Sequence, residues 1–148
     1  MAEQKIDIAI IDDDADDRAI FMQAAKNLDL GIRTLEFENG PQLVEFLQKS
    51  DNPLPQILFL DLNNPAMGGL ECLHIIKQMK KCSGILIAIY STSSMRKDVD
   101  GTFVLGADLY IKKPTELKEI EKYITKALKI NSNPLEMELS RKDYFLKI

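Results

Sequence analysis

Acidic, hydroxyl and ammonium side chains directly follow four of the five short apolar runs in this sequence. These are Asp12–Asp14 after the run 6–11, Asp61 after 57–60, Ser91–Ser94 after 85–90, and Lys112–Lys113 after 109–111. Carboxylates placed together repel one another, and Mg²⁺, which prefers oxygen ligands, relieves that repulsion. Asp61 can then act as a carboxylate nucleophile towards a phosphoryl group, with Lys113 and the Ser91 hydroxyl contacting the phosphoryl oxygens.

The apolar runs predict the strands that position these groups. Four of the runs (6–11, 57–60, 85–90 and 109–111) are nearly continuous, which suits strands buried on both faces, whereas the run 32–37 alternates like a half-exposed edge strand. Amphipathic stretches separate the runs and predict helices near 16–28, 41–49, 70–80, 95–105 and 117–128. Such β-then-α units predict a doubly wound α/β fold, whose ligand site lies at the carboxyl ends of the strands.

Composition narrows the classes of protein that fit. The 148 residues are enough for one domain, 45% of them are hydrophobic, and the net charge is −4. No dense Lys/Arg cluster indicates a nucleic-acid surface, and no apolar stretch is long enough for a signal peptide core or a membrane span. Cys72 and Cys82 lack metal-ligand spacing, and His74 is the only histidine, so we expect a reduced, cytoplasmic protein without a zinc site.

Four segments resemble the receiver domains of two-component response regulators. IAIIDDDADDR is similar to their first strand and acidic pair, and LFLDLNNPAMGGLE to their phosphoacceptor segment. IAIYSTSS resembles the fourth strand with its Ser/Thr, and GADLYIKKP the segment that ends in the family's Lys-Pro. The resemblance covers roughly residues 5–130. It implies a flavodoxin-like (βα)5 fold with five parallel strands in the order 2-1-3-4-5.

The resemblance also implies roles for residues at the strand ends. Asp61 matches the phosphoacceptor, and Asp12 and Asp13 match the acidic pair that holds Mg²⁺ together with Asp61. Asn63 sits where the family binds the metal through a backbone carbonyl, and Lys113 matches the phosphoryl-binding lysine.

Three further matches concern the switch. Ser91 matches the hydroxyl that moves towards the phosphoryl group, and Tyr110 matches an exposed aromatic ring that becomes buried in response. Pro114 follows Lys113 where the family commonly has a cis peptide bond.

Two residues depart from the family pattern: Asn64 replaces the usual Met, and Gly68 replaces the usual Asp. The resemblance therefore does not predict the local geometry or the partner contacts of the loop after Asp61. Three other classes of protein fit the sequence less well. An aspartyl phosphatase of the haloacid dehalogenase type needs a second Asp where Asn63 stands, and a flavodoxin needs a Ser/Thr/Gly-rich phosphate loop where this chain has Asp12–Asp14. A degenerate receiver that only binds protein would lack one of the acceptor, acidic pair or lysine.

The resulting prediction is a stand-alone receiver, residues 1–130, with a C-terminal tail, residues 131–148, that forms no separate domain. It is expected to be no enzyme beyond self-phosphorylation and autodephosphorylation. A sensor histidine kinase or histidine phosphotransfer protein would supply the phosphoryl group, and a downstream protein target would read it. A homodimer through the fourth helix, fifth strand and fifth helix is possible, and the apolar content of the tail predicts that it packs on its domain or on a partner.

Overall fold

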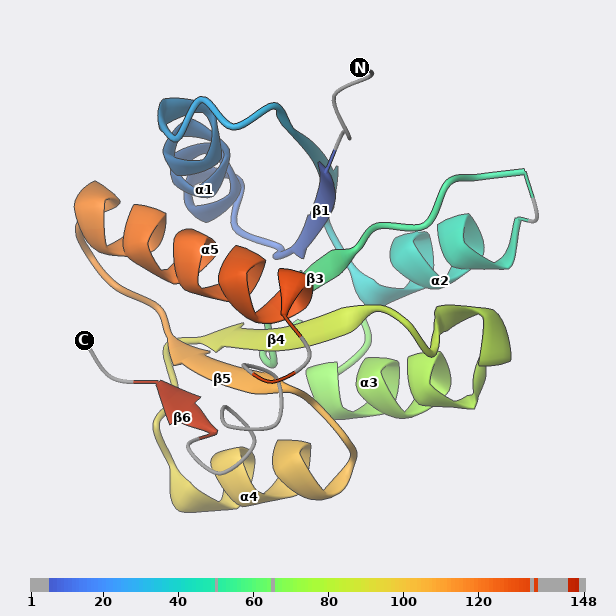
Figure 1. The fold of residues 1–148 in the computed structure, drawn as a ribbon. Helices are drawn as coiled ribbons and strands as arrows, with labels where there is room; N and C mark the ends of the chain where they lie inside the picture. The colour runs from blue at the N-terminus through green and yellow to red at the C-terminus, as the bar shows by residue number, and fades with distance from the viewer. Residues whose placement is uncertain (1–5, 50, 65, 134, 136–143, 147–148) are drawn as a thin grey trace.

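The fold is an α/β sandwich around one parallel sheet (Figure 1). The computed structural model describes residues 6–49, 51–64, 66–133, 135 and 144–146. Its elements are β1 (Ile6–Ile11), α1 (Ala15–Asn27), β2 (Ile32–Phe37), α2 (Gly40–Gln48), β3 (Ile57–Leu60), α3 (Gly69–Gln78), the 3₁₀ turn η1 (Lys80–Cys82), β4 (Leu86–Ser91), α4 (Arg96–Val104), β5 (Leu109–Lys112), α5 (Leu117–Ser132) and β6 (Phe145–Leu146).

The sheet confirms the predicted five parallel strands in the order β2-β1-β3-β4-β5. The central strands are buried on both faces, as their continuous apolar sequences predict, whereas edge strand β2 is only partly buried. The structure adds a sixth strand beyond the predicted unit, because β6 pairs in parallel with β5.

Each face of the sheet packs against its own set of helices. In Figure 1, α1 and α5 lie on one face, and α2 and α3 lie on the other. The first layer is built on Phe21 and Ile124, and the second on Leu43 and Leu73, all of them fully buried. This double covering leaves the carboxyl ends of the strands as the place where polar groups can gather.

Two helices begin at side chains that cap their backbone. Asp14 precedes α1 and accepts hydrogen bonds from the backbone N–H groups of Asp16 and Asp17. Asn39 precedes α2 and accepts one from Gln42, and Pro41 occupies the first turn, where its missing N–H costs nothing. The cap at Asp14 directs the acidic loop after β1 straight into α1.

Two residues of the C-terminal tail pack on the domain. Tyr144 is buried and Phe145 is half-buried, whereas Leu135 is 62% exposed. The prediction that the tail packs is therefore confirmed for Tyr144 and Phe145. The other apolar tail residues on which it rested include Met137, Leu139 and Ile148, which lie outside the described residues. No helix in the described ranges combines the length and apolar character needed to cross a membrane.

Phe21 offers a test of the α1–sheet core. Its ring is fully buried, with the Phe59 and Tyr90 rings at centroid distances of 4.8 and 5.6 Å. We predict that Phe21→Ala lowers the free energy of unfolding by about 3–5 kcal/mol, since it leaves a cavity in a packed layer. Urea denaturation measures the change. Val104→Ala, at a position 82% exposed, should stay within about 0.5 kcal/mol of the parent protein, and an equal loss in both variants would contradict this account.

Candidate functional site

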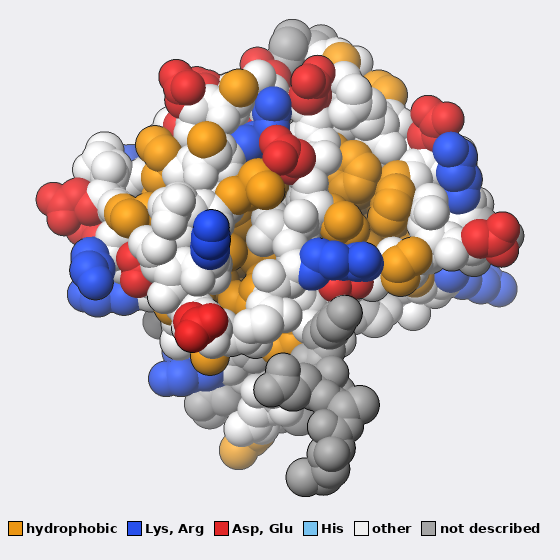
Figure 2. Space-filling view, turned by 90° about the horizontal axis from the view of Figure 1, so that it is seen from above, with side chains coloured by type: hydrophobic (Ala, Val, Ile, Leu, Met, Phe, Trp, Pro, Cys, Tyr) orange, Lys and Arg blue, Asp and Glu red, His pale blue; other side chains and the backbone are white. Residues whose placement is uncertain are grey.

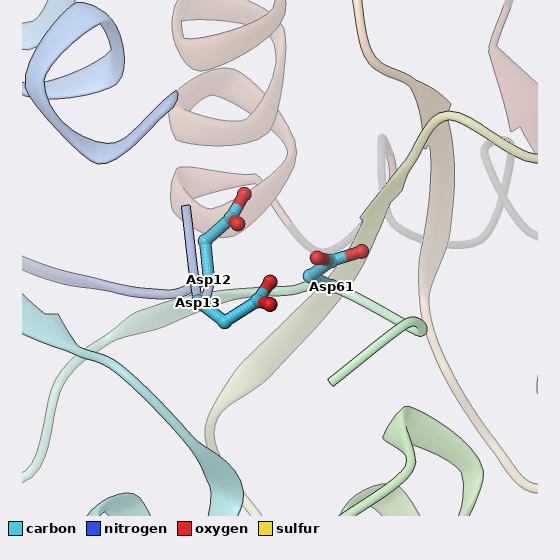
Figure 3. Close-up of side chains that lie close together, drawn as sticks. All are labelled: Asp12, Asp13 and Asp61. Atoms are coloured by element: carbon cyan, nitrogen blue, oxygen red, sulfur yellow. The ribbon is translucent and has the colours of Figure 1, made fainter. Parts of the chain in front are cut away.

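Three carboxylates converge at the carboxyl ends of β1 and β3 (Figure 3). Asp12 and Asp13 extend from the loop after β1, and Asp61 follows β3 directly. One oxygen from each lies within 4.8 Å of the others. Asp12 and Asp61 are buried, while Asp13 is exposed. The sequence-predicted acidic cluster thus forms, with one open side towards solvent.

Lys113, at the end of β5, supplies the positive charge of this cluster. Its Nζ donates to Asp12 Oδ2 at 2.6 Å and to Asp17 Oδ2 at 3.0 Å, and lies 3.6 Å from Asp61 Oδ2. The neighbouring Lys112 is exposed, so only one of the two lysines enters the site. The ammonium group of Lys113 therefore lies within ion-pair distance of three carboxylates, those of Asp12, Asp17 and Asp61.

Burial and charge act in opposite directions on these groups. Burial raises the pKa of Asp61 above its ordinary value, helped by the charges of Asp12 and Asp13, and the nearby Lys113 offsets only part of this rise. Burial alone would lower the pKa of Lys113. Its hydrogen bonds to Asp12 and Asp17 and the charge of Asp61 outweigh that and hold the pKa above its usual range. The site thus contains a firmly charged lysine and a carboxylate whose negative charge is poorly compensated.

Backbone hydrogen bonds tie the loops of the site to one another. Asp12 N–H donates to Phe37 C=O, Asp61 N–H to Ile11 C=O, and Lys113 N–H to Ser91 C=O, at 2.8 to 3.1 Å. These bonds extend the parallel ladders by one residue past β1, β3 and β5. The functional side chains consequently stand on backbone that the sheet holds rigid.

The loop after Asp61 closes tightly against it. A Cβ atom on Gly69 would lie 2.6 Å from Leu62 Cα and 2.8 Å from the Asp61 carbonyl oxygen, so only glycine fits there. Asn64, one of the two departures from the family pattern, is buried, and its side-chain amide donates to Glu38 C=O at 2.8 Å. Asn64 therefore links this loop to the segment before α2. At Gly68, the other departure, α3 begins without a side-chain cap.

The predicted phosphoryl-contacting and switch residues are brought together, but Tyr110 differs from the expectation. Ser91 is fully buried at the end of β4, and its Oγ accepts from Ser93 N–H at 3.2 Å. Tyr110 was predicted to be an exposed ring, and that is wrong here, since it is fully buried. Tyr144 and Phe145 pack against its ring, and its hydroxyl donates to Ser93 C=O at 2.8 Å.

The predicted cis bond before Pro114 is also wrong for this structure, because no cis peptide bond occurs among the described residues. The trans form is the intrinsically favoured one for an X–Pro bond. It is compatible with the site, since Lys113 reaches both Ser91 C=O through its backbone and Asp12 through its side chain.

Sequence reasoning missed two residues that support the site. The sequence pattern marks Asp17 only as an acid in the first turn of a helix, but in the structure it shares Lys113 with Asp12. Arg18 is buried, donating to Asp12 C=O at 2.7 Å and to Glu36 Oε1 at 3.0 Å. The available signal was position alone, because the first turn of the helix after an acidic loop lies beside that loop.

Comparison with known proteins agrees with this geometry. Residues 8–125 match the family model of the response regulator receiver domain. The chain belongs to the response regulator receiver domain family. It is 26% identical to response regulator Rcp1 from Synechocystis over 79% of this chain and 82% of Rcp1. It is 35% identical to the nitrate/nitrite response regulator NarL from Escherichia coli over 62% of this chain but only 40% of NarL.

Solved receiver structures share the fold. The Mn²⁺-bound form of Rcp1 superposes with a TM-score of 0.73 at 26% identity, covering 86% of this chain and 92% of that one. The phosphorylated cyanobacterial phytochrome response regulator RcpA superposes with a TM-score of 0.79 at 21% identity, covering 88% and 96%. The chain is thus a receiver of two-component phosphorelay signalling, and receivers in general are signalling modules that interact with histidine kinases and downstream targets.

The raised pKa of Asp61 predicts how this receiver responds to removal of that charge. Below the ordinary pKa of 3.8, Asp61 is protonated in both the folded and the unfolded state. Above the raised folded-state pKa it is ionised in both, and its burial then destabilises the fold. Asp61→Asn should therefore stabilise the metal-free protein at neutral pH, and the gain should fade as the pH falls through the folded-state pKa.

Urea denaturation with a chelator, across a pH series, measures this gain. Asp51→Asn, at an exposed position outside the acidic cluster, is the matched control and should change little. A variant at position 61 that is equally or less stable than the parent at neutral pH would show that Lys113 compensates the Asp61 charge fully.

Proposed function

We propose that Asp61 accepts a phosphoryl group in a Mg²⁺-dependent reaction and that the protein signals through altered contacts with other proteins. The supporting observation is the placement of Asp61 beside both the acidic pair and Lys113, at the carboxyl edge of the sheet. In the transfer, an Asp61 carboxylate oxygen bonds to the phosphorus of a phosphohistidine or a small phosphodonor as the bond to the leaving group breaks. The product is an acyl phosphate, and the imidazole or donor leaves with the electron pair of the broken bond.

The residues present fit a divalent cation. Asp12, Asp13 and Asp61 offer carboxylate oxygens, the ligand type that Mg²⁺ prefers, and the exposed side at Asp13 leaves room for waters and a phosphoryl oxygen. We place the Asn63 carbonyl as a further ligand, since its own N–H already donates to Asp61 Oδ1 at 3.3 Å and holds that turn close. When bound, Mg²⁺ would neutralise the carboxylates and the incoming phosphoryl charge. The Mn²⁺ named for the Rcp1 structure supports a divalent cation here.

Two side chains, Lys113 and Ser91, are proposed to contact the phosphoryl oxygens. Lys113 is anchored on Asp12 and Asp17 and lies near enough to Asp61 to pair with a phosphoryl oxygen there. The Ser91 hydroxyl, on the neighbouring strand end, would donate to another. Residues 1–130 form the receiver in this proposal, and residues 131–148 a tail without a domain of its own.

The proposed partners are a histidine kinase or a histidine phosphotransfer protein and a downstream protein target, in the cytoplasm. The face seen in Figure 2 carries basic and acidic side chains interspersed, a pattern that does not favour a nucleic acid. The homodimer through α4, β5 and α5 stays a prediction. This proposal differs from an aspartyl phosphatase because it limits the activity to self-phosphorylation and loss of the phosphoryl group. It differs from a degenerate receiver because the chain retains the full set of Asp12, Asp13, Asp61 and Lys113.

Intact-mass spectrometry after incubation with acetyl phosphate and Mg²⁺ tests the proposal. The parent protein should gain one phosphoryl group, and no gain should occur with a chelator. Asp61→Asn should abolish the gain because the amide oxygen is a poor nucleophile, whereas Asp51→Asn should retain it. A single phosphorylation that persists in Asp61→Asn would remove Asp61 from the role of acceptor.

Metal affinity provides a separate test of the acidic pair. We predict that Asp13→Ala weakens Mg²⁺ binding at least about tenfold, equivalent to about 1.4 kcal/mol, because one of three carboxylates is lost. Calorimetric titration measures the affinity. Asp16→Ala removes an exposed acid of α1 that lies outside the cluster and should leave the affinity within about twofold. Equal losses in the two variants would point to general charge rather than a ligand.

A further inference from the structure

The outer edge of β5 is covered by the chain's own C-terminal segment, Tyr144–Leu146 (Figure 1). Phe145 and Leu146 pair in parallel with Tyr110 and Ile111. The Tyr110 N–H, which points away from β4, donates to the Tyr144 carbonyl at 3.1 Å. The segment therefore supplies a backbone partner that β5 would otherwise lack on this side.

Tyr144 anchors the segment in a fitted contact. Its ring is 7% exposed and lies 5.1 Å from the Phe103 ring and 6.1 Å from the Tyr110 ring. Its hydroxyl donates to Thr102 Oγ1 at 2.7 Å. Thr102 is fully buried in α4, and its hydroxyl donates within the helix to the carbonyls of Asp98 and Val99, at 2.8 and 3.1 Å, which leaves a lone pair for Tyr144. Both the apolar ring and the polar tip of Tyr144 are thus matched.

These contacts have the form of peptide recognition by strand addition. In that mode, the main chain of an extended peptide pairs with a sheet edge while side-chain contacts supply specificity. Here β5 is the edge, and Thr102 and Phe103 of α4 with Tyr110 receive the tyrosine. Phe103, whose ring contacts the Tyr144 ring, remains 40% exposed, so part of this apolar contact surface is accessible to solvent.

We propose that the β5 edge and the adjoining face of α4 form a binding site for an extended segment led by tyrosine, and that residues 144–146 occupy it as an internal ligand. A partner protein can bind the β5 edge and the adjoining face of α4 only after residues 144–146 have dissociated from them. Because it is covalently connected, the internal segment has an effective concentration of about millimolar at this site. A separate peptide therefore competes poorly for the site while the segment is docked. This inference does not depend on phosphorylation of Asp61.

Amide hydrogen exchange of the full chain tests the docking. The Tyr110 N–H is bonded to the segment, whereas the Asp108 N–H, two residues earlier, is bonded to Ile87 C=O of β4 at 2.8 Å and serves as the internal control. Tyr144→Ala should speed exchange at Tyr110 at least about tenfold and leave Asp108 unchanged. Tyr144→Phe, which removes only the bond to Thr102, should speed Tyr110 exchange about 2- to 10-fold. Leu135→Ala, at an exposed tail position, should change neither.

Two outcomes of this experiment would overturn the proposal. One is unprotected exchange at Tyr110 in the parent protein, which would mean that the segment is not docked. The other is protection at Tyr110 that falls on dilution, which would make the occupant the segment of a second copy.

A peptide of residues 142–148, KDYFLKI, then tests the site itself. Fluorescence anisotropy of the labelled peptide should show binding to the full-length Tyr144→Ala chain at least about tenfold tighter than to the parent, whose site is filled. The same peptide with alanine in place of its tyrosine should not bind to either chain. Failure of the parent peptide to bind the Tyr144→Ala chain would overturn the assignment of a peptide site.

Discussion

The mutual repulsion of carboxylates at the carboxyl edge of the sheet is the constraint on which the site depends. Asp12 and Asp61 are buried beside the exposed Asp13, and within the described residues Lys113 is the cation that forms ion pairs with Asp12 and Asp61. Lys113 is held mainly by Asp12 and Asp17, so Asp61 keeps a charge that is only partly compensated. A cluster of carboxylates with this incomplete compensation is electrostatically suited to a divalent cation. The same incomplete neutralisation costs stability when the cation is absent.

Such a cluster persists because its backbone cannot relax. The ladder bonds that continue past the ends of β1, β3 and β5 fix the residues from which Asp12, Asp61 and Lys113 project. Gly69 lets the loop after β3 return against the Asp61 carbonyl. Side chains fixed on a rigid sheet edge need little reorganisation when charge arrives, which is the property that phosphoryl transfer requires most.

A second constraint acts at the outer edge of strand β5. An edge strand presents unpaired N–H and C=O groups that invite another strand. In this chain residues 144–146 pair with that edge of β5, and the same contacts bury Tyr110. The Tyr110 hydroxyl also donates to Ser93 C=O, and Ser93 N–H in turn donates to Ser91 Oγ at the end of β4. The docked segment is therefore connected, through Tyr110 and Ser93, to Ser91 at the carboxyl end of β4.

The sequence alone determined the fold class and the membership of the acidic cluster, and its resemblance to receiver domains supplied the strand order. Continuous apolar runs mark strands buried on both faces, and the residues that follow parallel strands must meet at one sheet edge. The tertiary structure alone decided the pairing of Asp17 with Lys113, the role of Arg18, the burial of Tyr110 and the sixth strand. Lys113 and Asp17 are 96 residues apart, and Tyr144 and Thr102 are 42 apart. Contacts of that separation leave no periodic trace in the sequence, because they depend on how completed elements pack and on which neighbouring group satisfies each buried polar atom.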